Sequence, residues 1–109
     1  RSRGLGDVYK RQVHMKESYI EGRLVEGVKR LGGMCLKFVS PGTLGVPDRI
    51  VITAKGRIIF VELKTETGRL AKIQRYTIGE MQKRGADVRV VKGIDEVKEL
   101  LAEIGGMQG

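Results

Sequence analysis

Apolar residues recur along this chain with two periods, one typical of helices and one typical of strands. Over residues 17–31 they return every three or four positions and stop at Gly32-Gly33, which predicts an amphipathic helix. Shorter apolar runs bounded by turn residues predict strands, and a loop rich in Pro and Gly is expected at 40–47. The predicted elements are a helix at 17–31, strands at 35–39, 48–53 and 57–64, a helix from Leu70 to near Gly85, a strand at 88–91 and a helix from Asp95.

The order of these elements, α-β-β-β-α-β-α, indicates an α/β fold. A hairpin followed by a strand that returns after a crossover helix requires a mixed sheet, flanked by helices as in an α/β sandwich. Aromatic residues make up only 5% of the chain, so the core is expected to be aliphatic. We expect one domain over residues 15–104 and a flexible tail over 105–109.

The strand at 57–64 carries two opposite charges near its end. Alternation places Glu62 and Lys64 on the same face of this otherwise apolar strand. If the preceding turn has three residues, with Gly56 in the left-handed conformation, the hairpin register puts Asp48 opposite Glu62. A two-residue turn would shift the register by one and send Asp48 to the other face. Two carboxylates and a lysine are therefore predicted to converge where a helix covers the sheet.

Such a buried group is costly unless a cation compensates for it, and Mg²⁺ prefers oxygen ligands of this kind. Asp48 and Glu62 would then bind the metal, with the backbone carbonyl of Leu63 as a further ligand. Lys64 would orient or help to deprotonate the attacking water, or neutralise charge in the transition state of phosphodiester hydrolysis. The alternative is a structural salt bridge between Glu62 and Lys64, since Glu-x-Lys also occurs at Glu96-Val97-Lys98.

Two polar residues on the predicted helices extend this candidate site. Glu21 lies at the edge of the apolar stripe of the first helix, where it is either a catalytic acid or a charge that favours the helix dipole. Gln74 lies within the apolar stripe of the second helix, so it needs a polar partner. That partner is either an active site beneath the helix or a loop carbonyl capped by the amide.

The counts of reactive residues exclude several other kinds of chemistry. One cysteine rules out an internal disulfide framework, and one histidine rules out a Cys/His zinc site. Ser–His–Asp catalysis is disfavoured because the single histidine, His14, lies in residues 1–14, a segment interpreted as non-native. Cys35, in a predicted strand among apolar neighbours, is expected to be a structural thiol. No segment has the length and hydropathy of a membrane span or a signal-peptide core, so a cytoplasmic location is expected.

The chain is basic, with a formal net charge of +8, which favours a polyanionic partner. Residues 1–14 resemble a translated sequencing adapter, most clearly at Asp7-Val8-Tyr9-Lys10-Arg11-Gln12, and are interpreted as a non-native, disordered head. Four basic residues and one acidic residue lie in this head, which leaves a net charge of +5 for the remainder. The candidate phosphate contacts around the motif are Lys37, Arg49, Arg69, Lys72 and Arg75.

As a set, these residues resemble a VRR-NUC domain of the standalone phage or bacterial type, a branch of the PD-(D/E)XK nuclease superfamily. The motifs that carry the resemblance are Lys37-Phe38, Gly45-Val46-Pro47-Asp48-Arg49, Phe60-Val61-Glu62-Leu63-Lys64, Gly68-Arg69-Leu70 and Gln74. The resemblance spans residue 17 to about residue 98 and implies a restriction-endonuclease-like α-β-β-β-α-β core. It also implies hydrolysis of DNA phosphodiesters with Mg²⁺ or Mn²⁺.

The resemblance implies a role for each motif residue. Asp48 and Glu62 would be metal ligands and Lys64 the catalytic lysine, while Gln74 matches the glutamine that follows the lysine in this branch. Glu21 matches the first-helix acid of related archaeal Holliday-junction resolvases, with Glu17, one turn earlier, as the alternative for that role.

The predicted function is therefore a metal-dependent, structure-specific endodeoxyribonuclease acting on branched DNA such as a Holliday junction. Because resolving a four-way junction needs two cuts, a homodimer with two active sites is expected. The candidates for its dimer surface are Leu44 and Val46 in the loop, or the final helix. Two alternatives stay open: a flap or nicking nuclease without junction preference, and a basic DNA-binding module that does not cleave.

Overall fold

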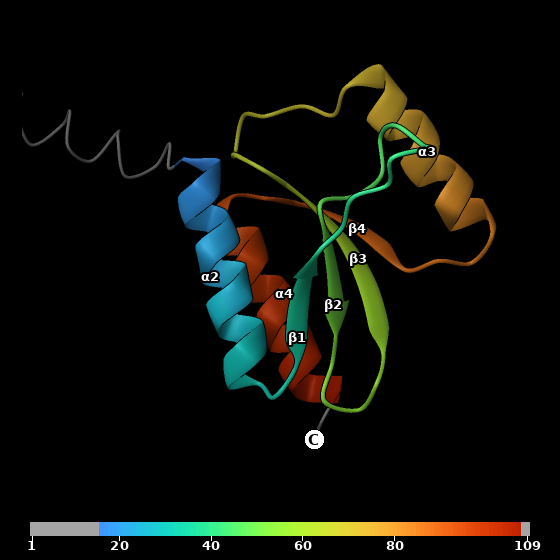
Figure 1. Ribbon diagram of the computed structural model, residues 1–109. Helices are drawn as coiled ribbons and strands as arrows, with labels where there is room; N and C mark the ends of the chain where they lie inside the picture. Colours follow the sequence, from blue (N-terminus) through green and yellow to red (C-terminus); the bar gives the residue numbers. More distant parts are fainter. Residues whose placement is uncertain (1–15, 108–109) are drawn as a thin grey trace, which may run out of the picture.

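A four-stranded mixed sheet organises the chain in the computed structural model, which describes residues 16–107 (Figure 1). The strands lie in the order β1-β2-β3-β4, with the first three antiparallel and β4 parallel to β3. The elements are α2 (Glu17–Arg30), β1 (Met34–Lys37), β2 (Arg49–Ile52), β3 (Ile58–Lys64), α3 (Lys72–Lys83), β4 (Val88–Lys92) and α4 (Gly93–Met107). The predicted order and the mixed sheet are confirmed, while the head predicted at 1–14 lies outside the described residues.

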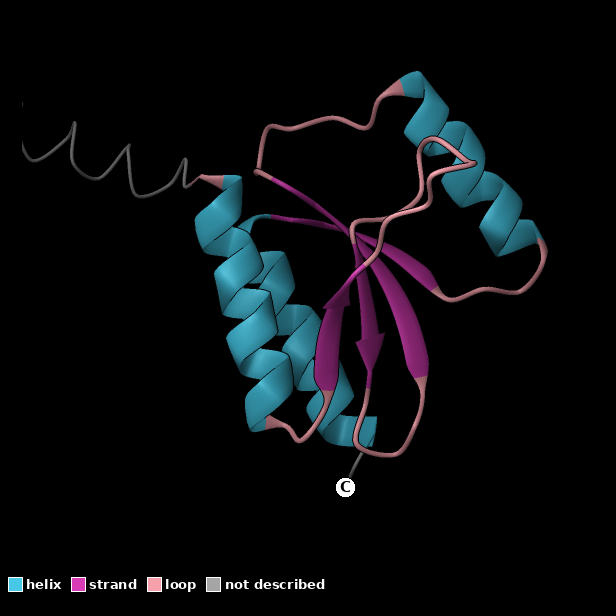
Figure 2. Ribbon diagram, in the orientation of Figure 1, coloured by secondary structure: helices cyan, strands magenta, loops and turns pink. Residues whose placement is uncertain are grey.

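The helices α2 and α4 lie side by side and cover one face of the sheet (Figure 2). Between them and the strands lies a core of aliphatic side chains, as the composition predicts. Burying each such side chain stabilises the fold by roughly 1.5–3 kcal/mol relative to leaving it in water. The core residues are Ile20, Leu24 and Val28 of α2, Val51, Ile59, Val61, Leu63 and Val91 of the sheet, and Val97, Leu100 and Ile104 of α4.

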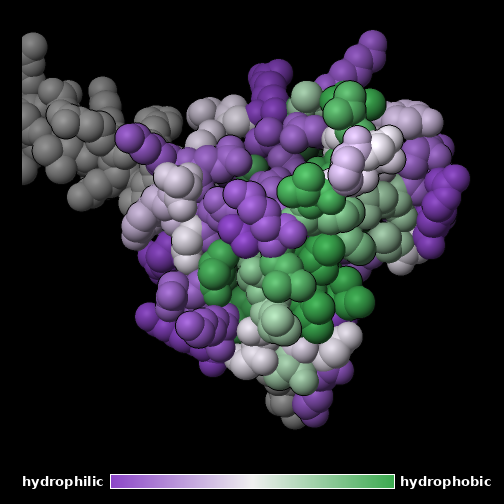
Figure 3. Space-filling view, viewed as in Figure 1, coloured by the Kyte–Doolittle hydropathy of each residue, from purple (hydrophilic) through white to green (hydrophobic). Residues whose placement is uncertain are grey.

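The opposite face of the sheet is only partly covered. Met34, Leu36 and Ile58 are 57%, 41% and 50% exposed, and hydrophobic side chains gather over this part of the face shown in Figure 3. The sequence predicts a helix over this face, and β3 is indeed the interior strand. However, α3 stands beside one end of the strands and packs mainly against β4, so among the described residues the rest of the face is left uncovered (Figure 1).

The turn between β2 and β3 sets the register of the hairpin. Gly56 has φ +87°, a conformation that side-chain-bearing residues rarely adopt, and its N–H donates a 2.8 Å hydrogen bond to the carbonyl of Thr53. The N–H of Thr53 in turn donates to the carbonyl of Arg57, which leaves a three-residue turn. Ile50 consequently pairs with Phe60, as predicted from the sequence.

The bounds of two helices differ from the predictions. The helix α3 begins at Lys72, so Leu70 belongs to the loop before it. The helix α4 begins at Gly93 and continues to Met107, so residues 105–107 are helical rather than an irregular tail. Ile104, which is 1% exposed, anchors this last part of α4 in the core. No helix in the described part of the chain is long and apolar enough to cross a membrane.

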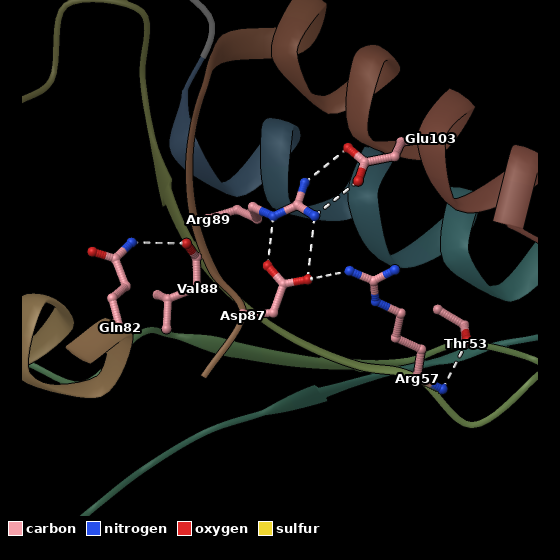
Figure 4. A network of polar contacts seen from close by, with 7 residues as sticks. All are labelled: Thr53, Arg57, Gln82, Asp87, Val88, Arg89 and Glu103. Atoms are coloured by element: carbon pink, nitrogen blue, oxygen red, sulfur yellow. Dashed lines mark hydrogen bonds and ion pairs between the residues drawn. The ribbon is translucent and has the colours of Figure 1, made fainter. Parts of the chain in front are cut away.

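A network of ion pairs connects β4 with the hairpin and with α4 (Figure 4). Asp87, just before β4, accepts from Arg57 at 2.9 Å and from Arg89 at 2.6 Å. The guanidinium of Arg89 also donates to both carboxylate oxygens of Glu103 on α4, each at 2.8 Å. These contacts hold β4 against the β2–β3 hairpin and against α4.

Candidate active site

The loop before β2 brings Asp48 to the end of the sheet. This loop is held against α3, because Thr77 donates a 2.7 Å hydrogen bond from Oγ1 to the carbonyl of Leu44. Gly45 has φ +84°, and a Cβ there would lie 2.5 Å from the carbonyl oxygen of Ile73. Glycine therefore permits both the turn and the close approach to α3, after which Asp48 directly precedes β2.

Asp48 lies next to Glu62, as the predicted register requires. Oδ2 of Asp48 accepts a 3.2 Å hydrogen bond from the backbone N–H of Leu63, the residue that follows Glu62. Glu62 is only 2% exposed. Burial and the neighbouring carboxylate of Asp48 raise the pKa of Glu62 to about 8, against the opposing effect of the Lys64 ammonium. Two acidic side chains held this close cannot both carry a negative charge at neutral pH without a compensating cation.

The two carboxylate oxygens of Glu62 differ in their surroundings. Oε2 lies 2.9 Å from Nε2 of Gln74, which donates to it, and 3.6 Å from Nζ of Lys64. Oε1 is buried and accepts no hydrogen bond from any residue in the described part of the chain. A buried oxygen without a donor is costly in a folded protein, so this atom marks a position for a further positive group.

Gln74 joins the first turn of α3 to this carboxylate pair. Its Oε1 accepts a 2.8 Å hydrogen bond from the backbone N–H of Ala71, the N-cap residue, while its Nε2 donates to Glu62. The sequence leaves open whether Gln74 contacts an active site or caps a loop carbonyl. In the structure the same amide contacts Glu62 and caps a backbone N–H group rather than a carbonyl.

Glu21 faces a different partner. Its Oε2 lies 2.8 Å from both Nε and Nη2 of Arg49, whose Nη1 donates to the carbonyl of Cys35 at 3.2 Å. Residues of β2 alternate between the two faces, so Arg49 points to the α2 side while Asp48 belongs to the other side. Within residues 16–107, no three acidic, His or Cys side chains form a group able to hold a metal. Glu17, the alternative first-helix acid, is exposed in the first turn of α2.

The thiol of Cys35 lies beside this Glu21–Arg49 pair. Burial raises the pKa of Cys35 to about 11, the Arg49 guanidinium lowers it and the Glu21 carboxylate adds to the increase. A thiol with this pKa is protonated at neutral pH, as expected for a structural cysteine.

A match to the VRR-NUC domain family model covers residues 12–95. This range contains Asp48, Glu62, Lys64 and Gln74, and it includes residues 12–14 of the segment interpreted as a head. The chain belongs to the VRR-NUC domain family.

Solved structures of VRR-NUC domains have the same fold. One, described as "VRR_NUC domain", superposes with a TM-score of 0.74 at 33% identity and covers 79% of this chain and 94% of its own. Another, "VRR_NUC domain protein", has a TM-score of 0.65 at 18% identity over 84% of this chain and 88% of its own. The restriction-endonuclease-like α/β fold predicted from the sequence is therefore confirmed.

A curated relative of this VRR-NUC chain is a phage protein. It is named "Putative nuclease p44", comes from Acyrthosiphon pisum secondary endosymbiont phage 1, and is 54% identical over 50 residues. Those residues are 46% of this chain and 54% of the relative, so the match spans about half the length of the curated protein.

The basic residues predicted to contact phosphates fall into three groups in this VRR-NUC domain. Arg49 is occupied by Glu21 and is only 16% exposed, so its guanidinium is not presented to a ligand. Lys37 and Lys72 are exposed at the end of β1 and the start of α3. Arg69 and Arg75 line an open pocket beside β4.

Lys92, which is not among the phosphate contacts predicted from the sequence, lines the same pocket. Lys92 is the register partner of Lys64 across the parallel β3–β4 pair. The sequence signal is the alternation of the predicted strand at 88–91. Extended by one residue and aligned in parallel with the strand at 57–64, it places Lys92 beside Lys64.

Proposed function

We propose that this domain is a metal-dependent endodeoxyribonuclease that cuts branched DNA. The observation that carries the proposal is the buried Oε1 of Glu62, which accepts no hydrogen bond from the described residues. It belongs to a carboxylate whose neighbours are Asp48 and Lys64. Asp48, just before β2, and Glu62 and Lys64 of β3 belong to the motifs on which the family resemblance rests.

The donor set fits a hard divalent cation. Asp48 and Glu62 supply carboxylate oxygens, and the backbone carbonyl of Leu63 is the further ligand we propose. Mg²⁺ is commonly bound by one or two carboxylates together with water and substrate phosphate, so a third acidic side chain is not required. When bound, Mg²⁺ or Mn²⁺ would supply Lewis-acid activation of the phosphate and a more acidic water.

The remaining residues position these groups. Lys64 has its ammonium 3.6 Å from Oε2 of Glu62 and is 19% exposed, so the carboxylate holds it while leaving it accessible. There it would orient the attacking water or neutralise charge that develops on the phosphate. Gln74 keeps Glu62 oriented through its 2.9 Å hydrogen bond and is therefore a positioning residue. Glu21, proposed from sequence as the first-helix acid, is tied to Arg49.

DNA as the substrate is supported by charge. A formal net charge of +5 outside residues 1–14 favours a polyanion, and contacts to phosphates hold a duplex without reading its bases. Only 5% of the chain is aromatic, which disfavours stacking on single-stranded bases and favours recognition of shape. A flap or nicking nuclease and a DNA-binding module that does not cleave are the alternatives. The proposed place of action is the cytoplasm of a bacterium or of a phage-infected host.

We also propose that two copies pair through the open face of the sheet. Met34, Leu36 and Ile58 expose apolar area there that a twofold partner would cover (Figure 3). Leu44, a candidate from the sequence, is 74% exposed in the neighbouring loop. A symmetric dimer would supply the two active sites that a four-way junction requires. Leu36→Lys should then shift sedimentation from dimer to monomer, and an unchanged sedimentation coefficient would contradict the pairing.

Cleavage of a panel of labelled DNA tests the proposed function. The wild-type chain and Asp48→Asn are incubated with four-way junction, flap and linear duplex DNA, in Mg²⁺, Mn²⁺ or EDTA. Asp95→Asn, an exposed acid in the first turn of α4, is the matched control. Paired nicks in the junction that need metal and Asp48 support the proposal. Preferential flap cutting supports the flap alternative, and salt-sensitive binding without any cutting supports the binding module.

A further inference from the structure

An open pocket of about 420 Å³ lies between the start of α3 and β4. Of the five described residues that line it, three are cationic and none is acidic. Arg69 and Leu70 belong to the loop before α3, and Arg75 lies in its first turn; Val90 and Lys92 belong to β4. The pocket thus combines a concentrated positive charge with a small apolar surface.

The pocket adjoins the candidate active site. In the parallel register of β3 and β4, Val90 pairs with Glu62 and Lys92 pairs with Lys64. Register partners lie on the same face of a sheet, and neighbouring strands are about 4.8 Å apart. On the helix side, Arg75 directly follows Gln74, whose amide donates to Glu62. Catalytic and pocket side chains are therefore neighbours on two adjacent strands and on α3.

The cationic side chains of the pocket form no ion pair with a carboxylate of the described residues. Arg49, Arg57 and Arg89 are each paired with carboxylates at 2.6–2.9 Å. In contrast, the side chains of Arg69, Arg75 and Lys92 take part in no ion pair among the described residues. Arg75 makes only a 3.3 Å hydrogen bond to the carbonyl of Leu70, which orients its guanidinium beside the pocket.

We propose that this pocket binds a second phosphate of the DNA strand being cut, next to the phosphate at Asp48 and Glu62. The inference rests on the proposed function and adds Lys92 to it as a substrate-binding residue. Guanidinium groups match the oxygens of a phosphate, and an ammonium adds a point charge. Leu70 and Val90 provide the apolar surface against which a sugar packs. The bound group is either an internal phosphodiester or a phosphate at a strand end.

Neutral substitution of single phosphates tests this contact. A short duplex is synthesised with one methylphosphonate at a time along one strand, and its affinity is measured in EDTA by fluorescence anisotropy. The wild-type chain should lose about tenfold in affinity at one position. Lys92→Gln should bind the unmodified duplex about tenfold more weakly, lose nothing further at that position, and show a salt slope reduced by about one.

Two further variants keep the test decisive. Arg75→Gln, at an exposed helix position, should likewise lose no further affinity when the methylphosphonate is at that position. Lys55→Gln, in the turn at the other end of β3, should lose affinity as the wild type does. Equal losses at every position in the wild type and in Lys92→Gln would overturn the inference. This affinity measurement needs no cleavage. If the effect of the methylphosphonate depends on Lys92 but the chain never cuts DNA, the proposed nuclease activity is disproved while the phosphate contact at the pocket stands.

The same duplex with and without a 5′-phosphate distinguishes the two sources of the phosphate. If only removal of the terminal phosphate weakens binding by the wild type and not by Lys92→Gln, the pocket binds a strand end. If only neutralisation of an internal phosphate has this effect, the pocket binds the continuous backbone. If neither has it, the proposed contact is absent.

Discussion

Gln74 donates a 2.9 Å hydrogen bond from Nε2 to Oε2 of Glu62, while its own Oε1 accepts the N–H of Ala71. The Gln74 side-chain amide thus caps the N-terminus of α3 and orients Glu62, the more buried of the two candidate metal ligands. This arrangement makes the position of α3 and the geometry of the carboxylate pair depend on each other.

Replacing Gln74 by Ala should lower kcat about tenfold or more with a small change in KM, because outer-shell partners of metal ligands typically carry effects of this size. Loss of the cap should also lower the free energy of unfolding by about 1 kcal/mol. Gln82→Ala is the control, since it removes a 3.1 Å hydrogen bond from the same helix to the carbonyl of Val88, away from Glu62. Equal kcat values for the two variants would argue against the positioning role.

The Glu21–Arg49 pair should act mainly on stability. Glu21→Gln leaves a guanidinium that is 16% exposed without its carboxylate, which should cost about 1–2 kcal/mol of the free energy of unfolding. Urea unfolding of Glu21→Gln, Arg49→Met and the double variant measures the coupling between them. A catalytic role for Glu21 predicts the opposite pattern, with cleavage lost and stability retained.

Much of this site follows from the sequence because its determinants are local. Gly56 and the alternation of the strand at 57–64 leave two possible hairpin registers, and the three-residue turn of the structure selects the one that places Asp48 opposite Glu62. The inward position of Gln74 likewise follows from helical spacing and requires a polar partner there.

Other features depend on contacts between distant segments. The pairing of Glu21 with Arg49 joins residues 28 positions apart and requires knowing which face of β2 meets α2. Lys92 becomes part of the site only through the parallel register between β3 and β4. The open face of the sheet could not be predicted either. The same alternation of apolar residues in a strand is expected whether a helix or a partner subunit covers that face.

The ion-pair network at β4 should make stability depend on acid pH. The guanidinium groups of Arg89 and Arg57 hold the pKa of Asp87 below its ordinary value of 3.8. Because the folded pKa is lowered, the stabilisation is complete above about pH 5 and is lost as the pH falls through the folded pKa. Asp87→Asn should therefore be less stable than the wild type by about 1 kcal/mol at pH 7. Thermal unfolding from pH 7 to pH 3 should show this difference shrinking, and a difference independent of pH would contradict the assignment.

Cys35 should react slowly with thiol reagents while the domain is folded. With a pKa of about 11, about one thiol in a thousand is ionised at pH 8, compared with about one in ten at its ordinary value of 9.0. Ellman's reagent should accordingly modify the native chain at least a hundredfold more slowly than the chain unfolded in guanidinium. Rapid modification of the native chain would instead identify a reactive thiol.

Binding of Mn²⁺ to the metal-free chain, measured by calorimetry with cleavage assayed on the same samples, tests the central claim most directly. The wild-type chain should bind Mn²⁺ and cut DNA, whereas Glu62→Gln, which keeps the size of the side chain but removes its charge, should do neither. Asp95→Asn should match the wild type in both measurements. If Glu62→Gln binds Mn²⁺ and cuts DNA as well as the wild type, the Asp48–Glu62 pair is not the metal centre.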